Sequence, residues 1–94
     1  MGDDRESIRR KKLLFRARHR GTREAGLLLG SFAERYLDEF DADRLDRFEA
    51  LLGIEDAVIY DWVAGLAEPA EMQRSDVVQM FLAFPFHRSR RLHE

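Results

Sequence analysis

The stretch TREAGLLLGSFAERYLDEF, residues 22–40, contains the most regular apolar pattern in the chain. Its apolar side chains recur at steps of three and four residues, which is the spacing of one face of an α-helix. Thr22 at its start is a residue type whose hydroxyl caps helix N-termini. The stretch therefore predicts a helix with one buried stripe, made of Leu29, Phe32, Ala33, Tyr36, Leu37 and Phe40.

A mostly exposed helix is predicted before this stretch. Ser7 can cap its start, and the helix runs to about His19. Gly21 then ends it, because glycine tolerates the left-handed conformation of a helix end. Little of this helix can be buried, since its large apolar side chains are few. They are Ile8, Leu13, and Leu14 or Phe15.

Three shorter helices are predicted afterwards, each opened by a capping Asp or Ser and closed by Gly or Pro. They run from Asp41 to Gly53, from Asp56 to Gly65, and from Ser75 and Asp76 to Pro85. No segment alternates with period two over a useful length. The sequence therefore predicts an all-α fold, a compact bundle of about five short helices. We expect residues 1–85 to form a single domain and 86–94 a flexible basic C-terminal tail.

Composition limits what the protein can do. A chain of 94 residues is too short to surround a large ligand, and its hydrophobic fraction of 45% suffices for one core. The absence of cysteine excludes disulfides, thiolate metal sites and cysteine nucleophiles. No apolar run approaches membrane-spanning length, and the acids Asp3, Asp4 and Glu6 argue against a transit peptide. We expect a bacterial cytoplasmic protein without direct membrane insertion.

Charge is segregated along the chain. Residues 1–23 carry nine Lys or Arg and three acids, whereas residues 24–76 carry four Arg and fourteen acids. Clustered basic residues on a helix can neutralise phosphates, so a nucleic-acid-binding helical module that uses the first helix is an alternative function. The acidic remainder and the lack of a helix-turn-helix spacing argue against nucleic acid as a partner. The segregation favours docking on another protein.

No constellation of residues predicts catalysis or a metal site. His87 and His93 are six residues apart in the predicted tail, and His19 lies in a basic helix that would repel a cation. The dense acids of residues 38–46 fall at caps and on polar helix faces, where capping and solvation explain them. No phosphate-binding loop or nucleophile elbow occurs. The sequence predicts a binding protein and not an enzyme.

The segment RGTRE, residues 20–24, lies at the predicted junction of the first two helices. Gly21 is explained as a helix terminator, but a glycine there also lets the surface of a partner approach the backbone closely. Glu24 falls in the first turn of the second helix, where the helix dipole favours a carboxylate. Arg20 supplies a planar fork of donors beside it. Capping is sufficient to explain each residue taken singly.

Two blocks of the sequence resemble the family of succinate dehydrogenase assembly factors, which promote covalent attachment of FAD to the flavoprotein subunit. Residues 15–40 resemble the opening helices of that family and its Arg-Gly-x-x-Glu motif, here Arg20, Gly21 and Glu24. Residues 48–65 resemble its second block, with a Leu-Leu pair, an acidic cap and an aromatic-x-Trp ending. The motif alone is weak support for the resemblance, because so short a pattern often arises by chance. Its position at a helix junction, together with the second block, makes the resemblance to the family specific.

The sequence departs from the pattern of this family at two places. Thr22 stands where many members carry a bulky residue, often Met. Ala25 and Gly26 stand where an acid commonly follows the motif glutamate. The first change alters the contact area, and the second removes a charge from the expected binding face. Neither change affects the three motif residues.

The resemblance implies a five-helix bundle that binds the flavoprotein subunit of succinate dehydrogenase, and that of fumarate reductase where it is present. It implies that Arg20, Gly21 and Glu24 contact this partner, together with the neighbouring Arg18, His19 and Arg23. In that family the motif faces the partner near the histidine that becomes bonded to the flavin. The chain would be an assembly factor, or chaperone, that orients the flavoprotein for flavinylation and binds no FAD stably itself.

Overall fold

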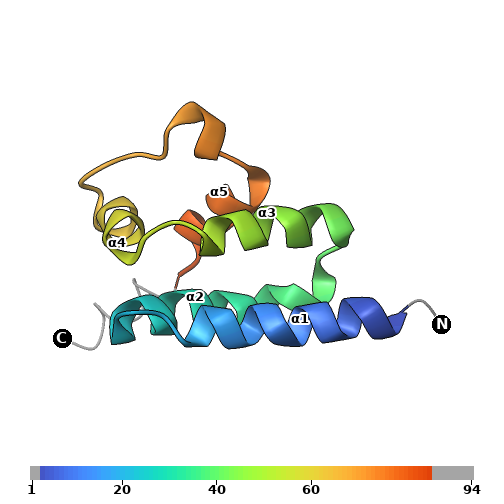
Figure 1. Cartoon of the computed structure of the whole chain (residues 1–94). Coiled ribbons are helices and arrows are strands. Elements are labelled where there is room, and N and C mark those ends of the chain that lie inside the picture. The colour runs from blue at the N-terminus through green and yellow to red at the C-terminus, as the bar shows by residue number, and fades with distance from the viewer. Residues whose placement is uncertain (1–2, 86–94) are drawn as a thin grey trace.

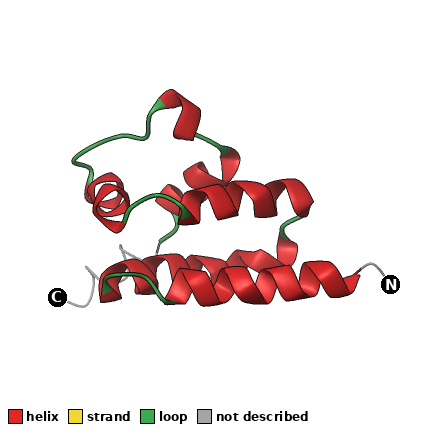
Figure 2. Ribbon diagram, viewed as in Figure 1, coloured by secondary structure: helices red, strands yellow, loops and turns green. Residues whose placement is uncertain are grey.

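The computed structural model describes residues 3–85, in which helices are joined by loops and no strand occurs (Figure 1, Figure 2). α1 (Asp3–Arg18) and α2 (Arg23–Tyr36) lie side by side as an antiparallel pair. The one-turn 3-10 helix η1 (Leu37–Glu39) follows α2 and leads the chain into a second layer. The first layer therefore consists of the two longest helices.

The second layer contains three shorter α-helices that lie over the α1–α2 pair (Figure 1). They are α3 (Ala42–Leu52), α4 (Asp56–Ala64) and α5 (Asp76–Ala83), with the 3-10 turn η2 (Glu71–Gln73) before α5. The predicted all-α bundle of five helices is confirmed. None of the helices of residues 3–85 is long and apolar enough to cross a membrane. The predicted tail, residues 86–94, lies outside the described residues.

Most predicted helix ends are confirmed by their hydrogen bonds. Through their side chains, Thr22, Asp41 and Ser75 each accept the backbone N–H three positions later, at 2.9 to 3.2 Å. Gly65 closes α4 in the left-handed conformation, with a φ of 79°. α5 ends two residues before Pro85, as the restricted backbone before a proline predicts. Local capping chemistry thus sets most of the boundaries.

Two predicted helix ends are wrong. α1 begins four residues before Ser7, which therefore lies inside the helix and not at its cap. Glu6 and Arg10 form an i,i+4 ion pair at 3.3 Å that favours helix on both sides of this serine. α2 ends at Tyr36, and the turn of η1 brings Phe40 into the core from outside the helix.

The predicted cap of α4 is also wrong. Its N-cap is Glu55, which makes no side-chain capping bond, and Asp56 is the first residue of the helix. The carboxylate of Asp56 accepts hydrogen bonds from Arg20 and from the backbone N–H of Thr22. A charged donor from another part of the chain therefore binds the side chain that local sequence reasoning assigned to a cap.

The core is built around Phe32 of α2. Its ring centroid lies 5.5 Å from that of Phe81 in α5, 5.9 Å from that of Phe48 in α3 and 6.2 Å from that of Phe40. Aromatic rings at these separations attract each other beyond their burial of apolar area. The stripe predicted for residues 22–40 is confirmed, except that Tyr36 is half-buried.

Two glycines of α2, Gly26 and Gly30, allow α1 to approach closely. A Cβ at Gly26 would lie 2.6 Å from the backbone carbonyl oxygen of Arg18, and a Cβ at Gly30 would lie 3.1 Å from the Cγ of Arg18. Ala17, the residue before Arg18, is fully buried. Because residues four apart share one face of a helix, this glycine spacing is the sequence signal of the contact. The predictions from the sequence did not include this contact.

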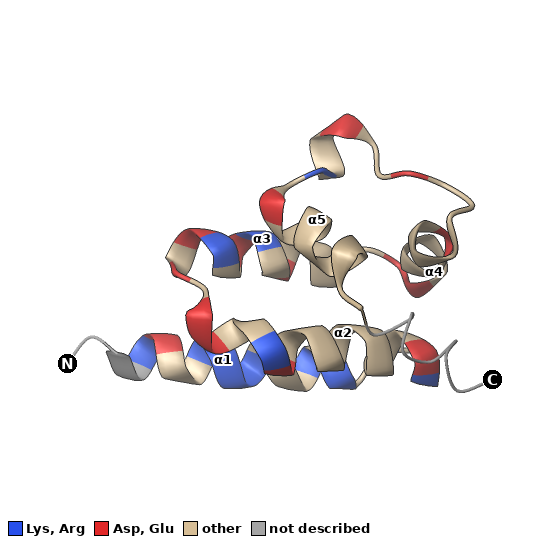
Figure 3. Cartoon of the chain, turned by 180° about the vertical axis from the view of Figure 1, so that it is seen from behind, with Lys and Arg blue, Asp and Glu red and all other residues tan. Residues whose placement is uncertain are grey.

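The segregated charges meet between α1, which carries seven Lys or Arg and three acids, and α3, which carries three acids and two Arg (Figure 3). Arg9 pairs with Asp46 at 2.6 Å and with Glu49 at 2.9 Å, and Arg16 pairs with Glu49 at 3.4 Å. The hydrogen bonds to Asp46 and then to Glu49 raise the pKa of the Arg9 guanidinium. Basic and acidic segments therefore neutralise each other in part, which weakens the basis of the nucleic-acid alternative.

We predict that Gly26→Ala lowers the stability of the fold. The added methyl group meets a backbone carbonyl that cannot rotate away, so α1 and α2 must move apart. Over-packing of this kind costs about 1 to 3 kcal/mol, and the upper end of that range exceeds the gain of about 1 kcal/mol that alanine brings to a helix. Gly30→Ala is the matched control and should be nearly neutral, because its methyl group meets a flexible side chain. Urea denaturation measures both, and equal stabilities would contradict the close contact.

Candidate functional site

The six predicted partner-binding residues fall at one end of the α1–α2 pair. Arg18 is the last residue of α1, and Arg23 and Glu24 are the first two residues of α2. The loop between them contains His19, Arg20, Gly21 and Thr22. The structure therefore brings all six residues together at one junction, although their side chains lie in different surroundings.

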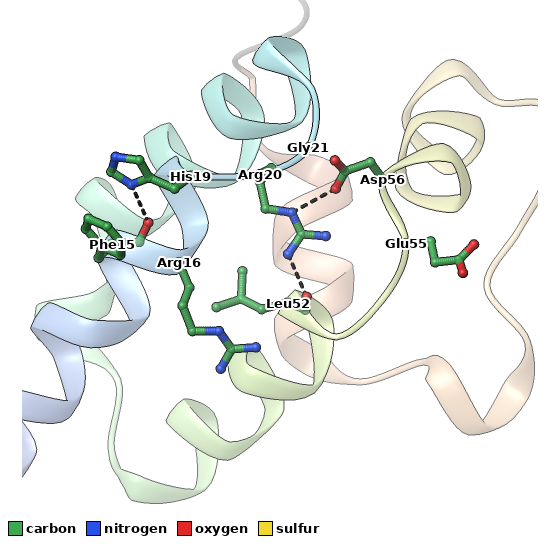
Figure 4. A pocket seen from close by; sticks show the side chains of 8 residues that line it. All are labelled: Phe15, Arg16, His19, Arg20, Gly21, Leu52, Glu55 and Asp56. Carbon is green, nitrogen blue, oxygen red and sulfur yellow. Dashed lines mark hydrogen bonds and ion pairs between the residues drawn. The ribbon is translucent and has the colours of Figure 1, made fainter.

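Arg18 and His19 lie on the exposed side of this junction. Arg18 pairs with Glu34 of α2 at 2.6 Å, and both side chains are about half exposed. The His19 ring stacks on Phe15 with a centroid distance of 3.9 Å, and its Nδ1 donates to the Phe15 carbonyl oxygen at 2.8 Å (Figure 4). In neutral His19 the other ring nitrogen, Nε2, is then an acceptor. Because Phe15 is 61% exposed, the stacked rings form an apolar surface beside the junction.

Arg20 is directed into the protein. Its Nε donates to Oδ1 of Asp56 at 2.8 Å. Its Nη1 and Nη2 donate to the carbonyl oxygens of Leu52 and Ile54, both at 2.6 Å. The side chain of Arg20 is 11% exposed and that of Asp56 is 18% exposed. The guanidinium therefore joins the α1–α2 loop to the α3–α4 loop (Figure 4), and these donors are not available to a partner while the bridge is intact.

Gly21 packs against the second oxygen of the same carboxylate. Asp56 Oδ2 accepts the backbone N–H of Thr22 at 3.1 Å, and a Cβ on Gly21 would lie 3.1 Å from this oxygen. The backbone of Gly21 is not left-handed, since Gly65 is the one glycine among the described residues with a positive φ. The predicted role of Gly21 as a left-handed helix terminator is therefore wrong. The space occupied by Asp56 is what favours glycine there.

Arg23 and Glu24 are exposed on the first turn of α2. Among the interactions of residues 3–85, no hydrogen bond or ion pair involves either side chain. Glu24 lies at the positive end of the α2 dipole, which stabilises its charge. Two charges of opposite sign are thus directed to solvent from the same turn, and both can interact with a docking protein.

An open hollow of about 480 Å³ lies beside the Arg20–Asp56 bridge (Figure 4). It is lined by residues from α1, the α1–α2 loop, the end of α3 and the start of α4: Phe15, Arg16, His19, Arg20, Gly21, Leu52, Glu55 and Asp56. An open hollow admits a projecting side chain of a partner and does not surround a small molecule. In the part of the chain that the structure describes, no group of three His, Asp or Glu could hold a metal ion.

Five residues that line the hollow were not assigned to a site from the sequence: Phe15, Arg16, Leu52, Glu55 and Asp56. Asp56 follows Glu55 at the start of a helix, where capping is the simplest explanation of an acid. A buried arginine needs a carboxylate partner, and this requirement could have indicated that an acid belongs to the site. It does not say which of the fourteen acids of residues 24–76 is the partner.

Comparison with known proteins identifies the family. The family model described as flavinator of succinate dehydrogenase matches residues 11–85, which include the whole junction. The chain belongs to this family. The predicted resemblance is thereby confirmed, whereas the roles predicted for single residues of the motif stay predictions.

Individual relatives carry corresponding names. The chain is 38% identical to the FAD assembly factor SdhE of Acetobacter pasteurianus over 65 residues, which are 69% of this chain and 60% of that protein. It is 44% identical to the mitochondrial succinate dehydrogenase assembly factor 2 of Scheffersomyces stipitis over 55 residues, 58% of this chain and 37% of that protein. The corresponding factor of Drosophila grimshawi is 33% identical over 75 residues, 78% of this chain and 51% of that protein. The match thus spans 37% to 60% of these relatives. No solved structure matches the chain significantly.

We predict that Arg20→Ala destabilises the fold more than Arg23→Ala does. Removing Arg20 takes away one of the two donors to the carboxylate of Asp56 and the side-chain donors to the carbonyl oxygens of Leu52 and Ile54. Breaking such a pair costs about 2 to 4 kcal/mol, below the range for a fully buried pair because Asp56 keeps some contact with water. Arg23→Ala removes an exposed charge and should change stability by no more than about 0.5 kcal/mol. Thermal denaturation compares the two, and similar melting temperatures would contradict the bridging role of Arg20.

Proposed function

We propose that this chain is an assembly factor that docks on the flavoprotein subunit of succinate dehydrogenase and promotes covalent attachment of FAD to it. The family match over residues 11–85 carries the proposal, and the names of the relatives support it. The proposal extends to the flavoprotein subunit of fumarate reductase where that enzyme is present. It assigns the chain a chaperone role in the bacterial cytoplasm and no catalytic residue.

The docking face in this proposal is the junction end of the α1–α2 pair. Five of the six predicted residues are exposed there: Arg18, His19, Gly21, Arg23 and Glu24. The stacked rings of Phe15 and His19 add apolar area next to the charges. A face that combines an apolar patch with charges of both signs favours one orientation of a partner over others.

The contribution of the chain to flavinylation is orientation. The bond forms between the flavin and a histidine of the flavoprotein, so the reacting groups both belong to the partner in this proposal. A docked factor that holds a mobile domain of the flavoprotein brings these groups into near-attack geometry and dissociates after the bond has formed. The open hollow suits this role, because it can receive part of a protein surface without holding a cofactor of its own.

Flavinylation in cells tests the proposal through Glu24. In a strain that lacks the native factor, the wild-type chain should raise the fraction of flavoprotein that carries covalent FAD, measured as in-gel flavin fluorescence after denaturation. Glu24→Gln should lower that fraction while the fold stays intact, because the side chain is exposed and makes no hydrogen bond or ion pair among the described residues. Glu71→Gln is the matched control, since Glu71 is an exposed acid in η2, in the opposite layer of the molecule. A strain whose flavinylation is indifferent to the expressed wild-type chain would refute the proposal.

Substitution of Gly21 tests where the partner docks. Gly21→Arg should abolish binding to the purified flavoprotein subunit, because a long side chain covers the loop and prevents close approach of the backbone. Far-UV circular dichroism should remain close to that of the wild type. Gly21→Ala adds a methyl group that requires only a small shift of Asp56, so it should retain most of the binding. If Gly21→Arg binds as the wild type does, the docking face lies elsewhere.

A further inference from the structure

The bridge between Arg20 and Asp56 differs from the other ion pairs of the described residues. Its two side chains are 11% and 18% exposed, whereas the Arg18–Glu34 pair is 49% and 55% exposed. Among the ion pairs of residues 3–85, the Arg20–Asp56 pair is the most buried. Exposed pairs contribute little to the geometry of a protein, but a buried pair with additional hydrogen bonds holds one arrangement.

The acceptors of Arg20 explain why it is directed inward. The carbonyl oxygen of Leu52 belongs to the last residue of α3, and that of Ile54 lies in the loop that follows. Carbonyl groups at a helix C-terminus lack partners within the helix and carry the negative end of its dipole, so they attract a cation. To donate to another protein, Arg20 would have to give up its hydrogen bonds to both carbonyl oxygens and to the Asp56 carboxylate.

The Asp56 carboxylate also binds the backbone of the loop that forms the proposed docking face. Asp56 uses Oδ1 to bind Arg20 and Oδ2 to accept the backbone N–H of Thr22. The hydroxyl of Thr22 in turn accepts the N–H of Ala25 and so starts α2. The first turn of α2 carries Glu24. A continuous chain of hydrogen bonds therefore connects the guanidinium of Arg20 to the turn that presents Glu24.

We infer that Arg20 is a positioning residue, which through Asp56 holds residues 21–24 in the conformation that docks and which does not itself contact the flavoprotein. This inference rests on the proposed function. Arg20 and Asp56 act on binding as one unit, so losing either should have the same effect as losing both. A residue that contacted the partner directly would act independently of Asp56.

A double-mutant cycle measures this dependence. Affinity for the purified flavoprotein subunit is measured for the wild type, Arg20→Gln, Asp56→Asn and the double variant, each shown to be folded at the working temperature. Each single variant should bind about tenfold more weakly, and the double variant should bind no more weakly than the weaker single one, as expected for coupled neighbours. Asp61→Asn is the matched control, because it removes an exposed carboxylate from the same helix. Independent effects, about a hundredfold loss in the double variant, would overturn the inference.

Hydrogen exchange of the free chain gives a second readout. If Arg20→Gln folds poorly, Arg20→Lys replaces it in both experiments. Loss of the bridge should speed exchange of the Thr22 and Ala25 amides more than that of core amides such as Leu45. Weaker binding with unchanged protection of these two amides would mean that Arg20 contacts the partner, and would overturn the inference. If the wild type does not bind the flavoprotein at all, the proposed function itself fails, an outcome distinct from independent effects in the cycle.

Discussion

The contact between α2 and the carbonyl oxygen of Arg18 sets the geometry on which the rest of the structure depends. Because Gly26 has no side chain, the last turn of α1 lies directly on α2. The loop between the two helices is therefore placed at the end of a closely packed pair. The opposite face of α2, centred on Phe32, remains to be buried against α3 and α5. The α1–α2 contact and the aromatic core thus involve different residues of the same helix.

The sequence predicted the helices well where local chemistry decides them. The stripe around Phe32 and the caps at Thr22 and Asp41 depend on residues close in the chain, and the structure has them as expected. The predictions for Ser7 and Asp56 were wrong. Ser and Asp are residue types that often cap helices, but this preference does not decide the role of a residue at a particular position. What the Asp56 carboxylate binds was decided by Arg20, 36 residues earlier in the sequence. Local reasoning has no access to such a contact.

The predicted site residues lie together at one helix junction, but the arrangement of their side chains was not predicted. The resemblance located residues 20–24, and the structure places them together at one junction. A basic residue in a charged, polar segment is expected to be exposed, and this expectation holds for Arg23 but not for Arg20. The role of Gly21 likewise depends on the position of Asp56, which is the first residue of α4. Burial of a charge depends on tertiary structure, so a linear motif does not distinguish contact residues from supporting ones.

The internal position of Arg20 is consistent with a docking face made from a loop. A short loop with a glycine at its centre has many conformations, and fixing one of them on binding reduces affinity. The three acceptors of Arg20, together with the bond from Thr22 to Asp56, fix this loop before a partner arrives. In the proposed function, an arginine can therefore strengthen docking without touching the other protein, because it restricts the loop to one conformation before binding. In a chain whose whole stability is expected to be about 5 to 10 kcal/mol, the same contacts also hold the α1–α2 pair to α3 and α4. Under the proposed function, loss of activity on changing Arg20 would reflect the conformation of the loop, whereas loss on changing the exposed Glu24 would report a contact with the partner.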